Sequence, residues 1–123
     1  MIKGFDNETA PLNEYEERTL LPIIANWLKQ TNKLKPIINK KATMYLNNKG
    51  YKINEARFRK IVNAIRMRDI VHNVVATSKG YYVSSDAEEV AAYIQSLRDR
   101  AGAINAMADA LVRQGSKIES TLF

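Results

Sequence analysis

The chain has no cysteine, a single histidine and no long apolar run. Without thiols, disulfides and thiolate zinc sites are excluded, and a reducing compartment is favoured. His72 has no second histidine or cysteine with which to share a metal. No run of about 18 apolar residues occurs that could span a membrane, and the start lacks the apolar stretch of a signal peptide. We therefore expect an intracellular, cytoplasmic protein with no metal or other cofactor.

The sequence also has few features of an enzyme. It has no glycine-rich phosphate loop. Ser78 and Lys79 are adjacent, but a nucleophile and base pair needs a third group to position it. Acidic residues cluster at the starts of predicted helices, where capping and the helix dipole explain them: Glu14, Glu16, Glu17, Asp86, Glu88 and Glu89. The sequence therefore predicts a binding protein and not a catalyst.

Acidic residues are scarce in the middle of the chain. Residues 33–80 hold twelve lysines and arginines against Glu55 and Asp69, a net charge of +10. The remaining residues hold seven basic and eleven acidic side chains, a net charge of −4, which gives +6 for the whole chain. Such asymmetry is typical of a face that binds a polyanion, although a merely solvated lysine-rich surface would give the same count.

The first two thirds of the chain predict three helices. Residues 1–12 lack periodicity and are expected to form a flexible arm. A helix follows, with Asn13 and Glu16 as a capping box and with Pro22 as a local disturbance. The second helix is predicted to run from Asn39, its expected cap, to a stop at Gly50. The third helix, which extends to about residue 70, is predicted to be capped by Asn54.

A β-hairpin and a long helix are predicted to follow. "NVVAT" and "YYVSS" are rich in β-branched and aromatic residues and flank a tip at "SKG". Ser85 is the predicted cap of the last helix, with Glu88 three residues later. This helix is expected to occupy residues 87–114 and to be followed by a tail at 115–123. The fold class is therefore mostly α with a small β-hairpin, in one domain at residues 13–86 followed by the long C-terminal helix.

The third helix has a core face and a basic face at about 100° per residue. Phe58, Ile61, Val62 and Ile65 share one arc. The opposite arc holds Arg59, Lys60, Asn63, Arg66 and Met67, with Arg57 and Arg68 at the borders. One helix can therefore enter a core and still present a dense positive charge to a partner.

The order of these elements resembles a winged helix-turn-helix. "ATMYLNNKGYKINEARFRKIVNAI" gives a small residue, a glycine turn and a second capped helix, and the hairpin follows as a wing. Residues 14–114 together resemble small winged-helix proteins of phages and prophages, in which a phrase like "ATSKGYYV" precedes a long helix. The resemblance implies three helices plus a wing, binding to double-stranded DNA, and a role in phage transcription regulation or replication. The alternative is a protein-interaction module, a phage-encoded inhibitor or adaptor of a host protein or nucleoprotein on the same scaffold.

The resemblance also implies which side chains contact DNA. Residues of the third helix would face base edges and phosphates, while the start of the second helix and the hairpin tip would contact the backbone. The expected contact residues are Lys40, Lys41, Asn54, Arg57, Arg59, Lys60, Asn63, Arg66, Ser78 and Lys79. Asn54 could also serve only as a helix cap, and Arg68 could pair locally with Asp69.

The last helix carries a coiled-coil seam. Its apolar residues step alternately by four and three over about 33 Å: Val90, Ile94, Leu97, Ala101, Ile104, Ala108 and Leu111. We expect a homodimer through Ile94, Leu97, Ala101, Ile104, Ala108 and Leu111. A different partner protein could fill the same seam, and its first turns could instead pack back on the first helix beside Trp27.

Overall fold

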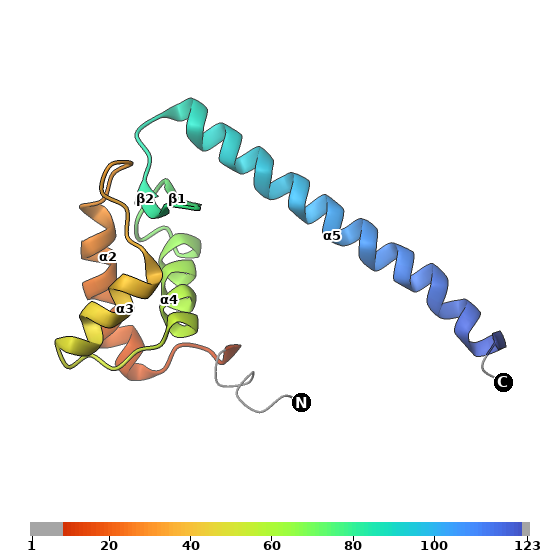
Figure 1. The fold of residues 1–123 in the computed structure, drawn as a ribbon, viewed down its shortest axis with the longest axis horizontal. Helices are drawn as coiled ribbons and strands as arrows, with labels where there is room; N and C mark the ends of the chain where they lie inside the picture. The colour runs from red at the N-terminus through yellow and green to blue at the C-terminus, as the bar shows by residue number, and fades with distance from the viewer. Residues whose placement is uncertain (1–8, 122–123) are drawn as a thin grey trace. The chain divides into compact units, whose positions relative to one another are not determined.

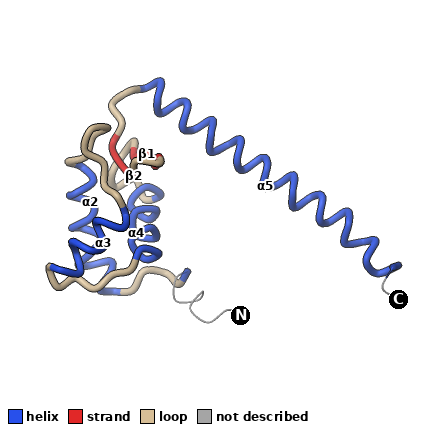
Figure 2. Tube along the Cα trace, viewed as in Figure 1, coloured by secondary structure: helices blue, strands red, loops and turns tan. Residues whose placement is uncertain are grey.

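A computed structural model describes the backbone of residues 9–121 and the side chains of residues 9–115. The chain divides into two compact units, Met1–Ser85 and Asp86–Phe123. The predicted order of helices, hairpin and long helix is confirmed (Figures 1 and 2). The elements are η1 (Glu16–Leu20), α2 (Leu21–Lys29), α3 (Asn39–Asn48), α4 (Glu55–Met67), β1 (Val74–Thr77), β2 (Gly80–Val83) and α5 (Ala87–Thr121). The predicted arm at 1–12 lies partly outside the described residues.

The first helical run begins with the predicted capping box. The backbone N–H of Glu16 donates to Asn13 Oδ1 at 2.8 Å, and the N–H of Asn13 donates to Glu16 Oε1 at 2.9 Å. The segment η1 is a π-helical turn, and Pro22 lies in the first turn of α2 directly after it. Proline has no N–H, so a helix that continues through it loses a hydrogen bond, and the wider turn absorbs the irregularity. The predicted disturbance is thus confirmed.

The helix α4 supplies the centre of the core. Phe58, Ile61, Val62 and Ile65 are fully buried, which confirms the predicted core face. The surrounding side chains come from η1, α2, α3, β1 and the segment before β1: Leu20, Ile24, Leu28, Ala42, Leu46, Val71 and Val74. Each fully buried large aliphatic side chain contributes about 2 kcal/mol. The core fixes the rotation of α4 and therefore decides which of its side chains face outward.

The turn between α3 and α4 is held by its own residues. Gly50 has a φ of +92°, which ends α3 in a conformation that glycine adopts without strain. The N–H of Tyr51 then donates to the carbonyl of Leu46 at 2.9 Å. The amide of Asn47 closes the turn, since Nδ2 donates to the Ile53 carbonyl at 2.7 Å and Oδ1 accepts the Ile53 N–H at 3.2 Å. These bonds set the crossing of α3 and α4.

The hairpin is joined to Ile37, two residues before the start of α3. The strands β1 and β2 pair antiparallel from Val74↔Val83 to Thr77↔Gly80. On the other side of β2, Ile37 and Tyr81 exchange two backbone hydrogen bonds of 2.8 Å. Gly80 has a φ of +122°, and a Cβ at this position would overlap the carbonyl oxygen of Ile37. This close approach places the start of α3 beside the hairpin, a contact that the sequence did not predict.

The loop between α2 and α3 is attached to β2 at both ends. At one end Thr31 Oγ1 accepts the N–H of Val83 at 3.0 Å, and at the other Ile37 pairs with β2. Between them Asn32 Oδ1 accepts the N–H of Leu34 at 2.9 Å, which closes a tight tip. The Leu34 side chain at this tip is 91% exposed.

The second unit is the single helix α5. Its cap is Asp86, whose Oδ1 accepts the N–H of Glu88 at 2.9 Å, so the prediction that Ser85 caps this helix is wrong. The carboxylate lies one residue nearer the helix and carries the charge that the dipole favours. The helix also continues to Thr121, beyond its predicted end at Gln114, because glycine at position 115 lowers helix propensity without ending the helix. No helix among residues 9–121 is long and apolar enough to cross a bilayer.

Candidate nucleic-acid interface

The N-terminal end of α3 carries positive charge from its exposed lysines. Ile38 is the N-cap residue, in an extended conformation and without a side-chain cap, so the prediction that Asn39 caps this helix is wrong. The Asn39 amide instead donates from Nδ2 to the carbonyl of Glu55 at 3.0 Å, which ties α3 to α4. The first turn contains no acid and exposes Lys40 and Lys41. Free backbone N–H groups and two cations at one helix end favour a bound anion.

A notch of about 220 Å³ joins this end of α3 to α4 and the hairpin. Its residues come from all three elements: Ile38, Asn39, Arg59, Ala76, Thr77, Ser78, Gly80 and Tyr81. Arg59 supplies five N–H donors, and Thr77 and Ser78 supply hydroxyls. Asn39 Oδ1 is buried and has no hydrogen-bond partner within the described part of the chain. The notch therefore combines donors suited to phosphate oxygens with one free acceptor suited to an amino group.

The outward face of α4 is a narrow stripe. Glu55, Arg59, Asn63 and Met67 recur every four residues and are all exposed. Of the other side chains predicted on this face, Lys60 and Arg66 are only partly exposed. Arg66 also makes contacts within the chain. Arg59 and Asn63 are thus the polar groups of α4 best placed to meet a partner.

The hairpin tip adds further donors next to the notch. Ser78 and Lys79 form the two-residue turn between the strands and are exposed. Thr77 Oγ1 accepts the N–H of Lys79 at 3.1 Å, which fixes the turn. Cationic side chains around this region have no acidic partner among residues 9–115: Lys40, Lys41, Arg59, Lys60 and Lys79. Their charge is available to a polyanion.

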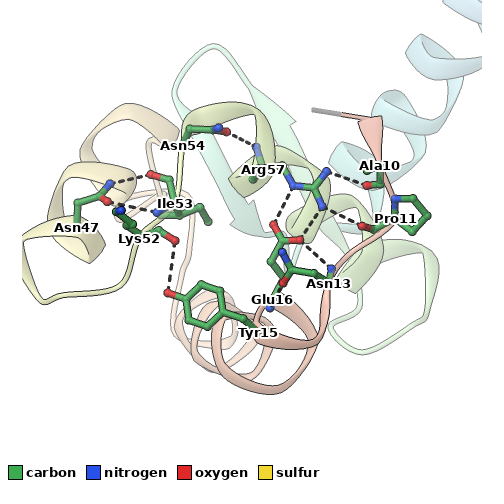
Figure 3. A pocket seen from close by; sticks show the side chains of 10 residues that line it. All are labelled: Ala10, Pro11, Asn13, Tyr15, Glu16, Asn47, Lys52, Ile53, Asn54 and Arg57. Carbon is green, nitrogen blue, oxygen red and sulfur yellow. Dashed lines mark hydrogen bonds and ion pairs between the residues drawn. The ribbon is translucent and has the colours of Figure 1, made fainter. Parts of the chain in front are cut away.

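Arg57 has a different environment from the one that its position on the helix suggested. Its guanidinium bonds Glu16 through Nε at 2.8 Å and Nη2 at 2.6 Å (Figure 3). It also donates to the carbonyls of Ala10 at 2.7 Å and Pro11 at 3.2 Å. The side chains of Arg57 and Glu16 are only 12% and 5% exposed. Arg57 therefore attaches the N-terminal segment to α4, beside a polar hollow of about 570 Å³ that also involves Lys52.

This ion pair changes the acidity of Glu16. The hydrogen bonds from Arg57 hold the pKa of the Glu16 carboxyl below its usual value, and they outweigh the opposing effect of burial. The N–H of Asn13 acts in the same direction, because it also donates to the carboxylate. Glu16 is therefore ionised in the fold at neutral pH.

Two further sequence expectations concern capping and pairing. Asn54 Oδ1 accepts the N–H of Arg57 at 2.8 Å, so the predicted cap of α4 is confirmed and this oxygen is occupied. Arg68 does not pair with its neighbour Asp69. It donates instead to both carboxylate oxygens of Glu17 at 2.7 Å, which corrects the expected local ion pair.

Sequence reasoning missed the partners that lie far away in the chain. Glu16 was found as a capping residue, but nothing in its spacing indicated Arg57, which is 41 residues away. Asparagine before an apolar stripe is commonly a helix cap, which is why the sequence predicts one at Asn39. The bridge between Ile37 and Tyr81 has no sequence signal either, since a single bridging residue is too short for a strand pattern.

The described residues contain no group of three or more histidine, cysteine or acidic side chains that could hold a metal ion. The site is instead an assembly of donors from three elements around one notch. Comparisons of the chain with models of protein families, with curated proteins and with solved structures found no match.

Proposed function

We propose that the first unit is a winged helix-turn-helix that binds double-stranded DNA. In this proposal α3 and α4 are the helix-turn-helix, and β1 and β2 are the wing. The observation that carries it is that cations without an acidic partner among residues 9–115 lie on α3, α4 and the hairpin, the three elements that line one notch. The bridge between Ile37 and Tyr81 supports it as well, because it fixes the hairpin beside the helix pair.

The proposed contacts divide into two kinds. Lys40 and Lys41 at the start of α3, and Lys79 in the hairpin, bind phosphate oxygens. Arg59 and Asn63 on the stripe of α4 meet base edges in the major groove, where arginine suits guanine and asparagine suits adenine. Arg57 has no part in these contacts, because its donors are bound within the fold.

We propose that this binding serves to regulate transcription or to support replication, as the resemblance to phage winged-helix proteins implies. Both roles need the same physical property, which is affinity for duplex DNA with preference for particular sites. Selection of bound sequences from a random duplex pool at physiological salt would reveal that preference. An enriched motif is expected to change when Arg59 or Asn63 is replaced.

Salt dependence of binding tests the proposal. Fluorescence anisotropy with a labelled duplex should show that the affinity falls as the salt concentration rises. The logarithm of the binding constant should fall linearly with the logarithm of the salt concentration, with a slope of about 0.9 per contacted phosphate. Lys79→Ala should weaken binding on all sequences and reduce that slope by about 1. Arg18→Ala is the control, because Arg18 is an exposed cation paired with Glu14 and lies outside the proposed contacts. No salt-sensitive binding of duplex DNA by the wild-type protein would refute the proposal.

A second candidate function is binding of another protein. One observation favours it, an apolar hollow of about 380 Å³ lined by Trp27, Ile38 and Tyr45. Tyr45 and the nearby Met44 are 54% and 58% exposed. Exposed apolar groups around a hollow are common at protein interfaces. If charge reversal at Arg59 and Lys79 leaves biological activity intact but Met44→Lys abolishes it, the interaction function replaces DNA binding.

A further inference from the structure

The helix α5 exposes a continuous apolar seam. The seam side chains of the predicted heptads are well exposed along it, from 42% at Ile94 to 69% at Ile104 and 59% at Leu111. The flanking residues Met107 and Val112 are exposed as well, at 63% and 75%. A stripe of this kind over about 30 Å of helix is far more apolar surface than an isolated helix retains in water. It is the mark of a helix that pairs with another.

We propose that the seam is filled by the α5 helix of a second copy of this chain, in antiparallel orientation. The proposal goes beyond DNA binding and concerns α5 alone. It stands whether or not the first unit binds DNA.

The sizes of the seam residues select the orientation. One set of heptad positions begins with Ile94 and continues with the small residues Ala101, Ala108 and Gly115, and the other holds Val90, Leu97, Ile104 and Leu111. In an antiparallel pair each position of the first set faces one of the second set. The layers become Ala101 with the partner's Ile104, Leu97 with the partner's Ala108, and Ile94 with the partner's Leu111. The central layers therefore each combine one large and one small side chain, and the two backbones can approach evenly.

A parallel pair in register would pack less evenly. Ala101 and Ala108 would each face their own copy, while Leu97 and Ile104 would do the same in the layers between them. Thick and thin layers would alternate. Straight helices held apart by the thick layers would leave voids in the thin ones, and voids weaken packing.

Charge along the helix favours the same orientation. The first turn carries Glu88 and Glu89, whereas Asp109 and Arg113 near the other end of the described side chains cancel in charge. An antiparallel pair keeps the acidic first turns of the two copies apart and also opposes the two helix dipoles favourably. A parallel pair would gather the acidic ends of both copies together.

The two orientations predict different distances between equivalent residues. With the seam aligned as above, Glu88 of one copy lies about 45 Å along the axis from Glu88 of the other, at 1.5 Å per residue. In a parallel pair the two would be separated only laterally, by less than about 25 Å with helix axes 8–10 Å apart. Ala103 lies near the centre of the alignment, so its separation is short in either orientation.

The lack of cysteine makes this measurable in the full chain. Glu88→Cys and Ala103→Cys, each carrying one spin label, are measured by pulsed electron resonance without DNA. The expected result is a distance of about 45 Å at position 88 and below about 25 Å at position 103. A short distance at position 88, or no dipolar coupling at position 103, overturns the proposal.

A sizing measurement provides the control. Ile104→Asp places a charge in the seam and should halve the mass of the wild-type dimer, whereas Ala103→Asp adds the same charge one residue away, outside the seam, and should not. The fluorescence of Trp27 reports that the first unit stays folded in both variants. A monomeric wild-type protein, as expected if another protein fills the seam, also overturns the proposal.

Discussion

Arg57→Ala should destabilise the first unit severely. The change leaves the Glu16 carboxylate, 5% exposed, without the guanidinium that binds both of its oxygens. It also leaves the carbonyls of Ala10 and Pro11 without their donor. Removing one partner of a buried ion pair costs about 3–5 kcal/mol, a large part of the roughly 5–15 kcal/mol that keeps a small domain folded.

Urea unfolding followed through Trp27 fluorescence measures this loss. A loss of about 3 kcal/mol shifts the midpoint downward by about 2 M when the slope is near 1.5 kcal/mol per M. Replacing both partners by apolar residues, Glu16→Leu with Arg57→Met, should restore most of the stability. The double variant buries no unpaired charge, unlike Arg57→Ala. Arg18→Ala breaks an exposed ion pair and should leave the midpoint unchanged.

A double-mutant cycle of Glu16→Leu alone, Arg57→Met alone and both together gives the refuting result. If Arg57→Ala unfolds within about 0.3 M of wild type, or the two sites couple by less than about 0.5 kcal/mol, the pair does not hold the N-terminal segment. The cycle also separates two explanations of any loss of DNA binding by Arg57→Ala. A folded double variant that binds DNA normally shows that Arg57 acts through the fold alone.

The same pair predicts a pH dependence. The folded-state pKa of Glu16 is below its usual value of 4.5, so the folded state binds its proton less readily than the unfolded state. Its contribution is therefore complete above that usual value and is lost as the pH falls through the folded-state pKa. Glu17, whose pKa Arg68 lowers, acts in the same direction. Glu16→Gln should be less stable than wild type at neutral pH and should approach it in acid; an equal deficit at both would contradict this.

Two further changes test the backbone geometry of the first unit. Gly80→Ala should cost about 3 kcal/mol or more, since it adds a strained positive φ and breaks the two hydrogen bonds to Ile37. Gly50→Ala has positive φ but open space and should cost only about 1–2 kcal/mol, so equal thermal shifts for the two would refute the steric argument. Asn47→Ala should cost about 1–3 kcal/mol by releasing Ile53, seen as faster hydrogen exchange in the turn; unchanged exchange would count against this clamp.

Much of the fold follows from local pattern. The core face of α4 was predicted because Phe58, Ile61, Val62 and Ile65 recur at helical spacing, and all four are buried. The hairpin was predicted because β-branched and aromatic residues surround a short polar tip. The capping residues are harder to predict, because several polar residues near each helix start could serve as the cap. The cap of α5, for example, is Asp86 and not Ser85.

The candidate site was harder to predict because its geometry depends on distant pairs. The charge count over residues 33–80 treated Arg57 and Arg68 as free, yet Glu16 and Glu17 from the first helical run bind them. Contiguous charge counts cannot detect such pairing, since the partners meet only after the helices pack. The notch depended likewise on a backbone bridge at Ile37 that has no side-chain signature.

The loop between α2 and α3 offers a practical place to modify the protein. Arg57 binds the carbonyls of Ala10 and Pro11, so a tag placed shortly before them would lie next to a contact that holds the fold. A tag placed after α5 would lie next to the apolar seam of that helix. The loop is held by β2 at Thr31 and Ile37, while Leu34 at its tip is almost wholly exposed. Doubling the length of a flexible loop costs only about 0.6 kcal/mol, so an epitope inserted beside Leu34 should leave both ends in place. Such an internal tag would allow purification and imaging with both termini unmodified.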